Sequence, residues 1–278
     1  MRLDAHEEEA PGKGKTISSI ERNGGVQSLL RALSLLDALA ENDDGQSLSA
    51  LAKTVCLPPS SAHRLLTTLQ RKHFVRFDPA AMTWRVGVRA FVVGNAFARS
   101  RELAPIAMPF MRQLMERTGE TVNLYVPNGG HAICIAQVQS RQVIRAISRP
   151  GGSLPLHRSA AGKAILARMS EFEVDELLAK HTPSEAERMS ARHRRKLHSE
   201  LREVRSRGYS VDDEEVASGL RCIATSIADE NGSAPGAVSI AGPVMRLTNQ
   251  RLPGLAESVL AAGEAMTREF GGARRTGS

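Results

Sequence analysis

Hydrophobic residues over positions 59–72 recur at the helical period. Four of them fall at i, i+3, i+4 and i+7 and predict one buried side of a helix, made of Ala62, Leu65, Leu66 and Leu69. The opposite side carries short hydroxyls and long cations, at Ser60, Arg64, Thr67 and Arg71, flanked by His63 and Thr68. Such a rod can lie in a groove of a duplex and donate hydrogen bonds to base edges and phosphates.

Two more helices are predicted before this one. Residues 49–55 form a short helix that a tight turn over residues 56–58 joins to residues 59–72, in the outline of a helix-turn-helix. A longer helix begins near Val26 and ends at residues 42–45, with a buried stripe expected at Val26, Leu29, Leu33, Leu36 and Ala40. Taken alone, these residues fit a groove-reading helix and an amphipathic hairpin with a solvated basic face equally well.

Two short β-prone runs follow, at residues 74–77 and 83–87, around a turn that contains a proline. Three helices and a hairpin make a winged helix-turn-helix, and this context favours the groove reader. In the hairpin, Arg76 or Arg85 would lie near phosphates or the minor groove. Trp84, the only tryptophan, is expected to pack the wing onto the helices rather than stack on a base.

Beyond the wing the pattern changes. Residues 88–104 predict a connecting helix, and after the breaks at Pro105 and Pro109 a further helix runs to Glu116, closed by Gly119. Strands are predicted at residues 121–126, 132–138, 143–147, 222–228 and 237–241. Helices are predicted at residues 160–169, 171–180, 191–207 and 249–269. Antiparallel strands flanked by helices indicate an α/β sensor domain.

The chain is therefore expected to be an α/β two-domain protein, and its 278 residues suffice for two domains of ordinary size. The expected order is a polar, mobile tail over 1–25, a winged helix-turn-helix over 26–87, a linker helix over 88–104, an effector-binding domain over 105–272 and a tail over 273–278.

The charge of the chain supports an anionic partner. The formal net charge is +7 and the isoelectric point about 9.8. Between Lys53 and Arg89 there are seven Lys or Arg residues and one acid, Asp78, so polyanion binding is assigned to this segment. No apolar run approaches a membrane span and no secretory leader is recognisable, so the protein is expected in the cytoplasm, away from membranes.

The segment 157–164 ends in Gly162-Lys163 and invites comparison with a phosphate-binding loop. It lacks the first glycine, since His157 stands there, and Ala164 replaces the Ser or Thr that follows the lysine. Nucleotide hydrolysis is not expected. Ser159 can cap a helix whose free N–H groups suit a small anion, although an ordinary capped helix accounts for the same residues and is favoured locally.

Other candidate chemistry is sparse. Residues 212–215 are all acidic and are either a metal site or a solvated acidic turn; without a nearby histidine the turn is favoured. The three cysteines form no CxxC pair, which argues against a disulfide framework and a zinc site. Because no nucleophile, base and orienting group come together, the protein is expected not to be an enzyme and to need no metal or cofactor.

Several motifs, in the right order, resemble the IclR family of bacterial transcriptional regulators. They are the winged segment and residues 154–164, 207–215, 219–224 and 239–243. The resemblance covers residues 26–270 and implies a winged helix, a linker helix and a GAF-like effector domain. It further implies binding to double-stranded operator DNA as a homodimer or a dimer of dimers. Its nearest counterparts repress a carbon-metabolism operon such as that of the glyoxylate bypass and respond to glyoxylate or pyruvate.

The candidate residues form two sets. The DNA-binding set comprises the helix residues Ser60, Ser61, His63, Arg64, Thr67 and Thr68, with Lys53, Arg76 and Arg85 on phosphates. The effector set implied by the resemblance comprises Val143, Ala146, Leu154, Ala160, Ala161, Asp212, Leu220, Cys222, Ser239 and Ala241. From the local residues alone, an ordinary capped helix is favoured at Ser159. With the resemblance, an effector site at the start of this helix is favoured instead.

Two positions of the effector pocket depart from the family pattern, as do Cys56 and His73 near the reader helix, where the family commonly has glycine. Ala241 stands where the nearest counterpart has a second pocket serine, and Ala146 where it has a larger apolar residue. A lost hydroxyl removes a hydrogen bond of about 0.5–1.5 kcal/mol to a neutral partner, and the pocket would be roomier. Asp212 would also repel a carboxylate unless one of them is protonated or a water intervenes. Alternatives are therefore a regulator of aromatic-acid catabolism and, remotely, a small oxo-acid enzyme with a DNA-binding appendage.

Overall fold

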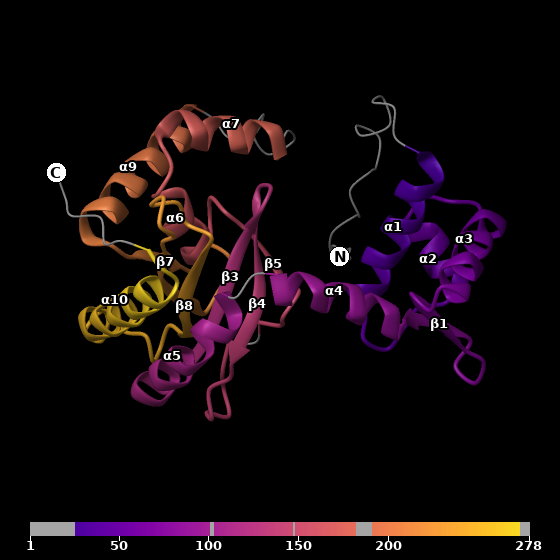
Figure 1. Cartoon of the computed structure of the whole chain (residues 1–278), viewed down its shortest axis with the longest axis horizontal. Helices are drawn as coiled ribbons and strands as arrows, with labels where there is room; N and C mark the ends of the chain where they lie inside the picture. Colours follow the sequence, from indigo (N-terminus) through magenta and orange to yellow (C-terminus); the bar gives the residue numbers. More distant parts are fainter. Residues whose placement is uncertain (1–25, 101–102, 147, 182–190, 273–278) are drawn as a thin grey trace, which may run out of the picture. The chain divides into compact units, whose positions relative to one another are not determined.

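The computed structural model describes residues 26–100, 103–146, 148–181 and 191–272 (Figure 1). The chain divides into two compact units, Met1–Arg99 and Ser100–Ser278. The predicted tails at both ends, two residues of the predicted linker and the last residue of the predicted strand 143–147 lie outside the described residues.

Between residues 26 and 87 the first unit forms three helices and a two-stranded hairpin, as the sequence predicts. These are α1 (Gln27–Ala40), α2 (Leu48–Thr54), α3 (Pro59–Arg71), β1 (Val75–Asp78) and β2 (Thr83–Val86). Leu35, Leu51 and Leu66 meet in the core between the helices. Trp84 is buried there, with its ring 5.0 Å from that of Phe77, so the expectation that it packs the wing onto the helices is confirmed.

The predicted buried stripe of α1 is largely wrong. The buried residues of this helix are Leu35, Ala38 and Leu39. Val26, Leu29 and Leu33 are 66%, 57% and 48% exposed, Ala40 is exposed, and only Leu36 packs partly against the core. The helix has two apolar faces, and periodicity alone cannot tell which of them the core of the same chain will cover.

Two helices follow the wing, α4 (Val88–Ser100) and α5 (Leu103–Thr118). Contrary to the expected breaks, α5 includes both prolines: Pro105 lies in the first turn, where a missing N–H costs little, and Pro109 lies inside the helix. The end of α5 is as predicted, because Gly119 follows it with φ +75°, a conformation that glycine adopts without strain.

The second unit is built on a six-stranded antiparallel sheet with the order β5-β4-β3-β8-β7-β6. Its strands are β3 (Thr121–Asn128), β4 (His131–Val138), β5 (Ser153–Pro155), β6 (Ser210–Asp213), β7 (Leu220–Ile227) and β8 (Gly236–Pro243). The short edge strands β5 and β6 were not predicted. The predicted strand at 143–147 is wrong over residues 143–146, which form bends and irregular backbone.

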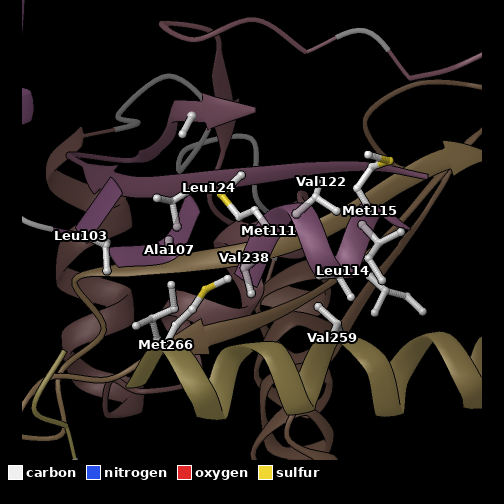
Figure 2. Packing of buried hydrophobic residues seen from close by; sticks show 14 of the residues in the cluster. Leu103, Ala107, Met111, Leu114, Met115, Val122, Leu124, Val238, Val259 and Met266 are labelled. Atoms are coloured by element: carbon white, nitrogen blue, oxygen red, sulfur yellow. The ribbon is translucent and has the colours of Figure 1, made fainter. Parts of the chain in front are cut away.

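Helices cover both faces of this sheet. On one face α5 and α10 (Leu252–Glu269) enclose the larger core; Figure 2 shows Met111 and Leu114 beside Val238, with Val259 and Met266 reaching from α10. On the other face α6 (Ala160–Leu166) packs on the strands, and α7 (Glu171–His181) and α9 (Ala191–Arg207) pack over it. Within the described part of the chain, no helix has both the length and the apolar character needed to cross a membrane.

Candidate functional sites

The exposed face of α3 carries the polar residues that its sequence predicts. The turn before it passes through Cys56 in the left-handed region, at φ +52°, and Pro59 opens the helix. Ala62 and Leu66 are fully buried against α1 and α2, which turns the opposite side outward. Ser60, His63, Arg64 and Thr68 are exposed on that side, and Ser61 and Thr67 are half-buried.

The two threonines of α3 have their hydroxyl protons occupied. Thr67 Oγ1 donates to the carbonyl of His63 and Thr68 Oγ1 to that of Arg64, both at 2.8 Å. Their outward groups are therefore methyls and oxygen lone pairs, which suit thymine methyls and amino donors of bases. Arg64 is left as the strong donor of this face.

The wing brings two cations face to face. Arg76 and Arg85 are directly opposite each other in the β1–β2 register, and like charges in this position repel. Arg76 is exposed, while Arg85 is half-buried and donates from Nη1 to the carbonyl of Asp43 at 3.3 Å. An anion beside this pair relieves the repulsion, as a DNA phosphate would. Lys53, on the exposed side of α2, is the third cation expected at phosphates.

One basic residue of this surface escaped the sequence analysis. A hollow of about 380 Å³ is lined by Ser28 and Arg31 of α1 together with Ser61, Arg64 and Leu65 of α3. Arg31 is the only Lys or Arg of α1, and periodicity assigned this helix only a core role. A single cation on an otherwise uncharged stretch of this helix was the sequence signal that could have indicated a role in DNA binding.

The inner face of the sheet, on the α6 side, is unusually polar. Residues paired across antiparallel strands point to the same face, so the register defines rows of side chains. One row runs through Asp212, Cys222, Ala241 and Thr121, and the next through Ser210, Ala224, Ser239, Asn123 and Gln137. Tyr125 and Cys134 pair in a third row. The sequence-predicted residues Asp212, Cys222, Ser239 and Ala241 are thus brought together.

Burial sets the electrostatics of this face. Asp212 is 2% exposed; its Oδ1 accepts from the backbone N–H of Glu215 at 2.8 Å and of Val216 at 3.3 Å, yet burial still raises the pKa of the carboxyl. Burial also raises the pKa of the Cys222 thiol, and that of Cys134 to about 11. A raised pKa favours the protonated thiol in both residues, which disfavours a nucleophilic role.

Asn123 contributes a buried donor that the sequence analysis missed. Its Oδ1 accepts from Gln137 Nε2 at 2.9 Å, whereas its Nδ2 is buried without a hydrogen-bond partner. A buried unsatisfied donor costs about 1–3 kcal/mol, which a ligand oxygen can recover. The signal was present in the sequence, because polar residues 121, 123 and 125 alternate with Val122, Leu124 and Val126.

The glycine and lysine of the 157–164 segment have structural roles. A Cβ on Gly162 would lie 2.2 Å from the carbonyl oxygen of Leu156, so only glycine allows this approach. Lys163 is 2% exposed and forms ion pairs with Glu200 and Glu215. Ser159 caps α6 as predicted, its Oγ accepting from the N–H of Gly162 at 3.1 Å. No phosphate is required to explain these residues.

The expectation of a solvated acidic turn at 212–215 is corrected in part. Asp212 and Asp213 belong to β6, and Asp212 is buried. Asp213 forms a bidentate ion pair with Arg221, and Glu214 and Glu215 lie in the bend that follows β6, with Glu214 at φ +63°. Among the described residues no three His, Cys, Asp or Glu side chains gather as a metal site would require.

The remaining candidate effector residues differ in burial, and one of them lies outside the buried inner face. Ala160 and Ala161 are buried at the start of α6, and Ala146 is buried, with its carbonyl accepting from Thr121 Oγ1 at 3.3 Å. Leu154 and Leu220 are half-buried. Val143 is 94% exposed on an irregular segment and is not part of this buried face.

A winged helix-turn-helix with a basic outward helix, in one chain with an α/β domain that has a polar inner face, defines a two-domain DNA-binding regulator. Residues 28–79 match the IclR helix-turn-helix domain and residues 95–268 the bacterial transcriptional regulator IclR C-terminal domain.

Known repressors align with this chain over nearly its whole length. The chain is 43% identical over 268 residues to the acetate operon repressor of Salmonella typhimurium and 42% identical to the transcriptional repressor IclR of Escherichia coli K12; each alignment covers 95% of this chain and 97% of the relative. The crystal structure of Thermotoga maritima IclR has 29% identity and a TM-score of 0.66, over 88% of this chain and 98% of that one. The chain belongs to the IclR family and is a DNA-binding transcriptional repressor of that family.

Proposed function

We propose that this repressor controls an operon of acetate or glyoxylate metabolism and releases its DNA when a small 2-oxo acid binds the inner face of the second unit. The operon assignment rests on the 43% identity to the acetate operon repressor. The observation that carries the effector assignment is the unpartnered, buried Nδ2 of Asn123, which lies in one sheet row with Ser239.

The chemistry of the inner face supports a carboxylate ligand. Asn123 and Ser239 supply neutral donors, and the first turn of α6, at Ala160 and Ala161, directs backbone N–H groups out of the helix. Burial raises the pKa of Asp212, which reduces the repulsion between its carboxyl and an acid ligand. Cys222 and Ala241 add small side chains beside them.

DNA contact is proposed for the outward face of α3 and for the wing. Arg64 would read a base, Ser60, Ser61, His63, Thr67 and Thr68 would line the groove, and the cations Lys53, Arg76, Arg85 and Arg31 would hold phosphates.

The protein is proposed to act as a homodimer. Exposed large apolar residues on α1 and the first turns of α4, including Leu29, Leu33, Phe91 and Val92, support pairing of two first units. Two units related by a two-fold axis would read half-sites one helical turn or a multiple of it apart, and a dimer of dimers would read two such sites. We propose a cytoplasmic location, because the relatives of this chain are bacterial transcription repressors.

The test uses the full chain and fluorescently labelled DNA from the promoter of the acetate operon, with anisotropy as the readout. Glyoxylate or pyruvate should release the DNA, and Ser239→Ala should raise the concentration needed. Ser258→Ala, an equally small change on α10, is the matched control and should not. Release by benzoate or 4-hydroxybenzoate alone would overturn the oxo-acid assignment in favour of aromatic-acid control, and absence of saturable binding to this DNA would overturn the operon.

A further inference from the structure

A second hollow in the α/β unit lies away from the proposed effector residues. It has a volume of about 460 Å³, within the range of ligand sites. The ends of α6 and α9, the last turns of α10 and the strand β7 surround it. It lies where β6 begins: Ser210, the first residue of β6, pairs with Ala224, so Thr225 and Ser226 of β7 have no partner in β6.

Four arginines line this hollow: Arg168, Arg205, Arg207 and Arg268. Glu264 is the single acid among its lining residues. Two of the arginines bond to carbonyl oxygens: Arg205 donates to Ala167 and Met169 at 2.9 and 2.7 Å, and Arg207 to Tyr209 at 2.7 Å. These bonds fix the side chains without neutralising their charge.

Helix ends account for only part of this charge. Three helix C-termini meet here, and each carries roughly half a negative charge that arginines commonly balance. With the carboxylate of Glu264, they offset a little over half of the four positive charges, which leaves an excess of about +1.5. Thr225 and Ser226 of β7 also line the hollow; Thr225 Oγ1 donates to the carbonyl of Gly208 at 2.9 Å, and Arg168 Nε donates to Ser226 Oγ at 3.0 Å.

We propose that this hollow, named here the arginine groove, binds a small anion of about two negative charges through its oxygen atoms. The anion is either a phosphate or a dicarboxylate. The volume admits such a molecule, the N–H groups of Arg205 and Arg207 that do not bond to carbonyls can donate to phosphoryl or carboxylate oxygens, and the excess positive charge suits an anion. This site is separate from the oxo-acid site of the proposed function and does not depend on it.

The experiment is calorimetric titration of the full chain with inorganic phosphate and, separately, with succinate, at constant ionic strength. One ion should bind per chain, and comparing the two probes distinguishes a phosphoryl from a carboxylate ligand. R207Q/R268Q removes two exposed charges of the groove and should weaken binding at least tenfold. R192Q/R195Q removes two exposed charges from the start of α9, outside the groove, and should not change it.

A third variant keeps this result distinct from the effector site. Asp212→Asn should bind the dianion as the wild type does. Absence of saturable binding of both probes, equal loss in the two double variants, or loss in Asp212→Asn with none in R207Q/R268Q would each overturn the proposal. Thermal unfolding of R207Q/R268Q close to that of R192Q/R195Q would show that the loss does not come from misfolding.

Discussion

Replacing Asp212 with asparagine is expected to stabilise the protein at neutral pH and to change its stability little in acid. Burial raises the native pKa of this carboxyl above its ordinary value. A carboxyl with a raised native pKa binds its proton more tightly when folded, so the wild type loses stability as the pH rises from the unfolded pKa through the native one. Asparagine keeps the shape and cannot ionise.

The magnitude follows from opposing contributions at Asp212. The two backbone N–H groups that it accepts from favour the ionised form, each by about 1 kcal/mol over a neutral acceptor. Burial outweighs them, because the net direction of the pKa is upward. Each unit by which the native pKa exceeds the unfolded one is worth about 1.4 kcal/mol above the native pKa. The stability difference between variant and wild type should therefore grow with pH and then level off.

Urea unfolding of both proteins from acid to neutral pH measures this difference, in which the other carboxylates cancel. Asp213→Asn is the neighbouring control and should show the opposite sign, since it removes the bidentate partner of Arg221. If Asp212→Asn were less stable than the wild type by the same amount at every pH, its N–H contacts would dominate and the reasoning from burial would fail.

Three other changes test separate parts of the molecule. Gly162→Ala should lower the free energy of unfolding by about 2 kcal/mol or more, because its Cβ would meet backbone at 2.2 Å; an unchanged urea midpoint would contradict this. Lys163→Met should cost roughly 2 kcal/mol, less than for a fully buried pair, since Glu200 and Glu215 are 28% and 33% exposed and can be rehydrated; a gain in stability would refute it. Arg64→Ala should weaken specific DNA binding by about 1–3 kcal/mol and non-specific binding far less; equal losses would make it a phosphate contact.

The sequence predicts the helical elements well because their periodicity is long and strong, as in α3 and α9. It fails where elements are short or two faces compete. β6 has four residues, two of them acidic, and becomes a strand only because β7 offers an edge. In α1 both faces are apolar, so the choice of Leu35 over Leu33 belongs to the packing of α2 and α3.

The candidate sites were predictable to different depths. Local periodicity places Arg64 and its neighbours on one exposed face, whereas Asp212, Cys222 and Ser239 come together only through the register of three strands. Asn123 was missed because its unpartnered amide is a property of the folded row and not of the sequence.

The inner face of the sheet and the arginine groove both contact α6, one at its start and the other at its end. At its start, Ser210 Oγ donates to the carbonyl of Ala160 at 2.6 Å; just beyond its end, Arg205 holds the carbonyl of Ala167. Between them Lys163 joins Glu215 to Glu200 of α9, and the N–H of Glu215 is bound to Asp212. These groups form one continuous series of polar contacts from β6 to α9, in which each group is held by the next.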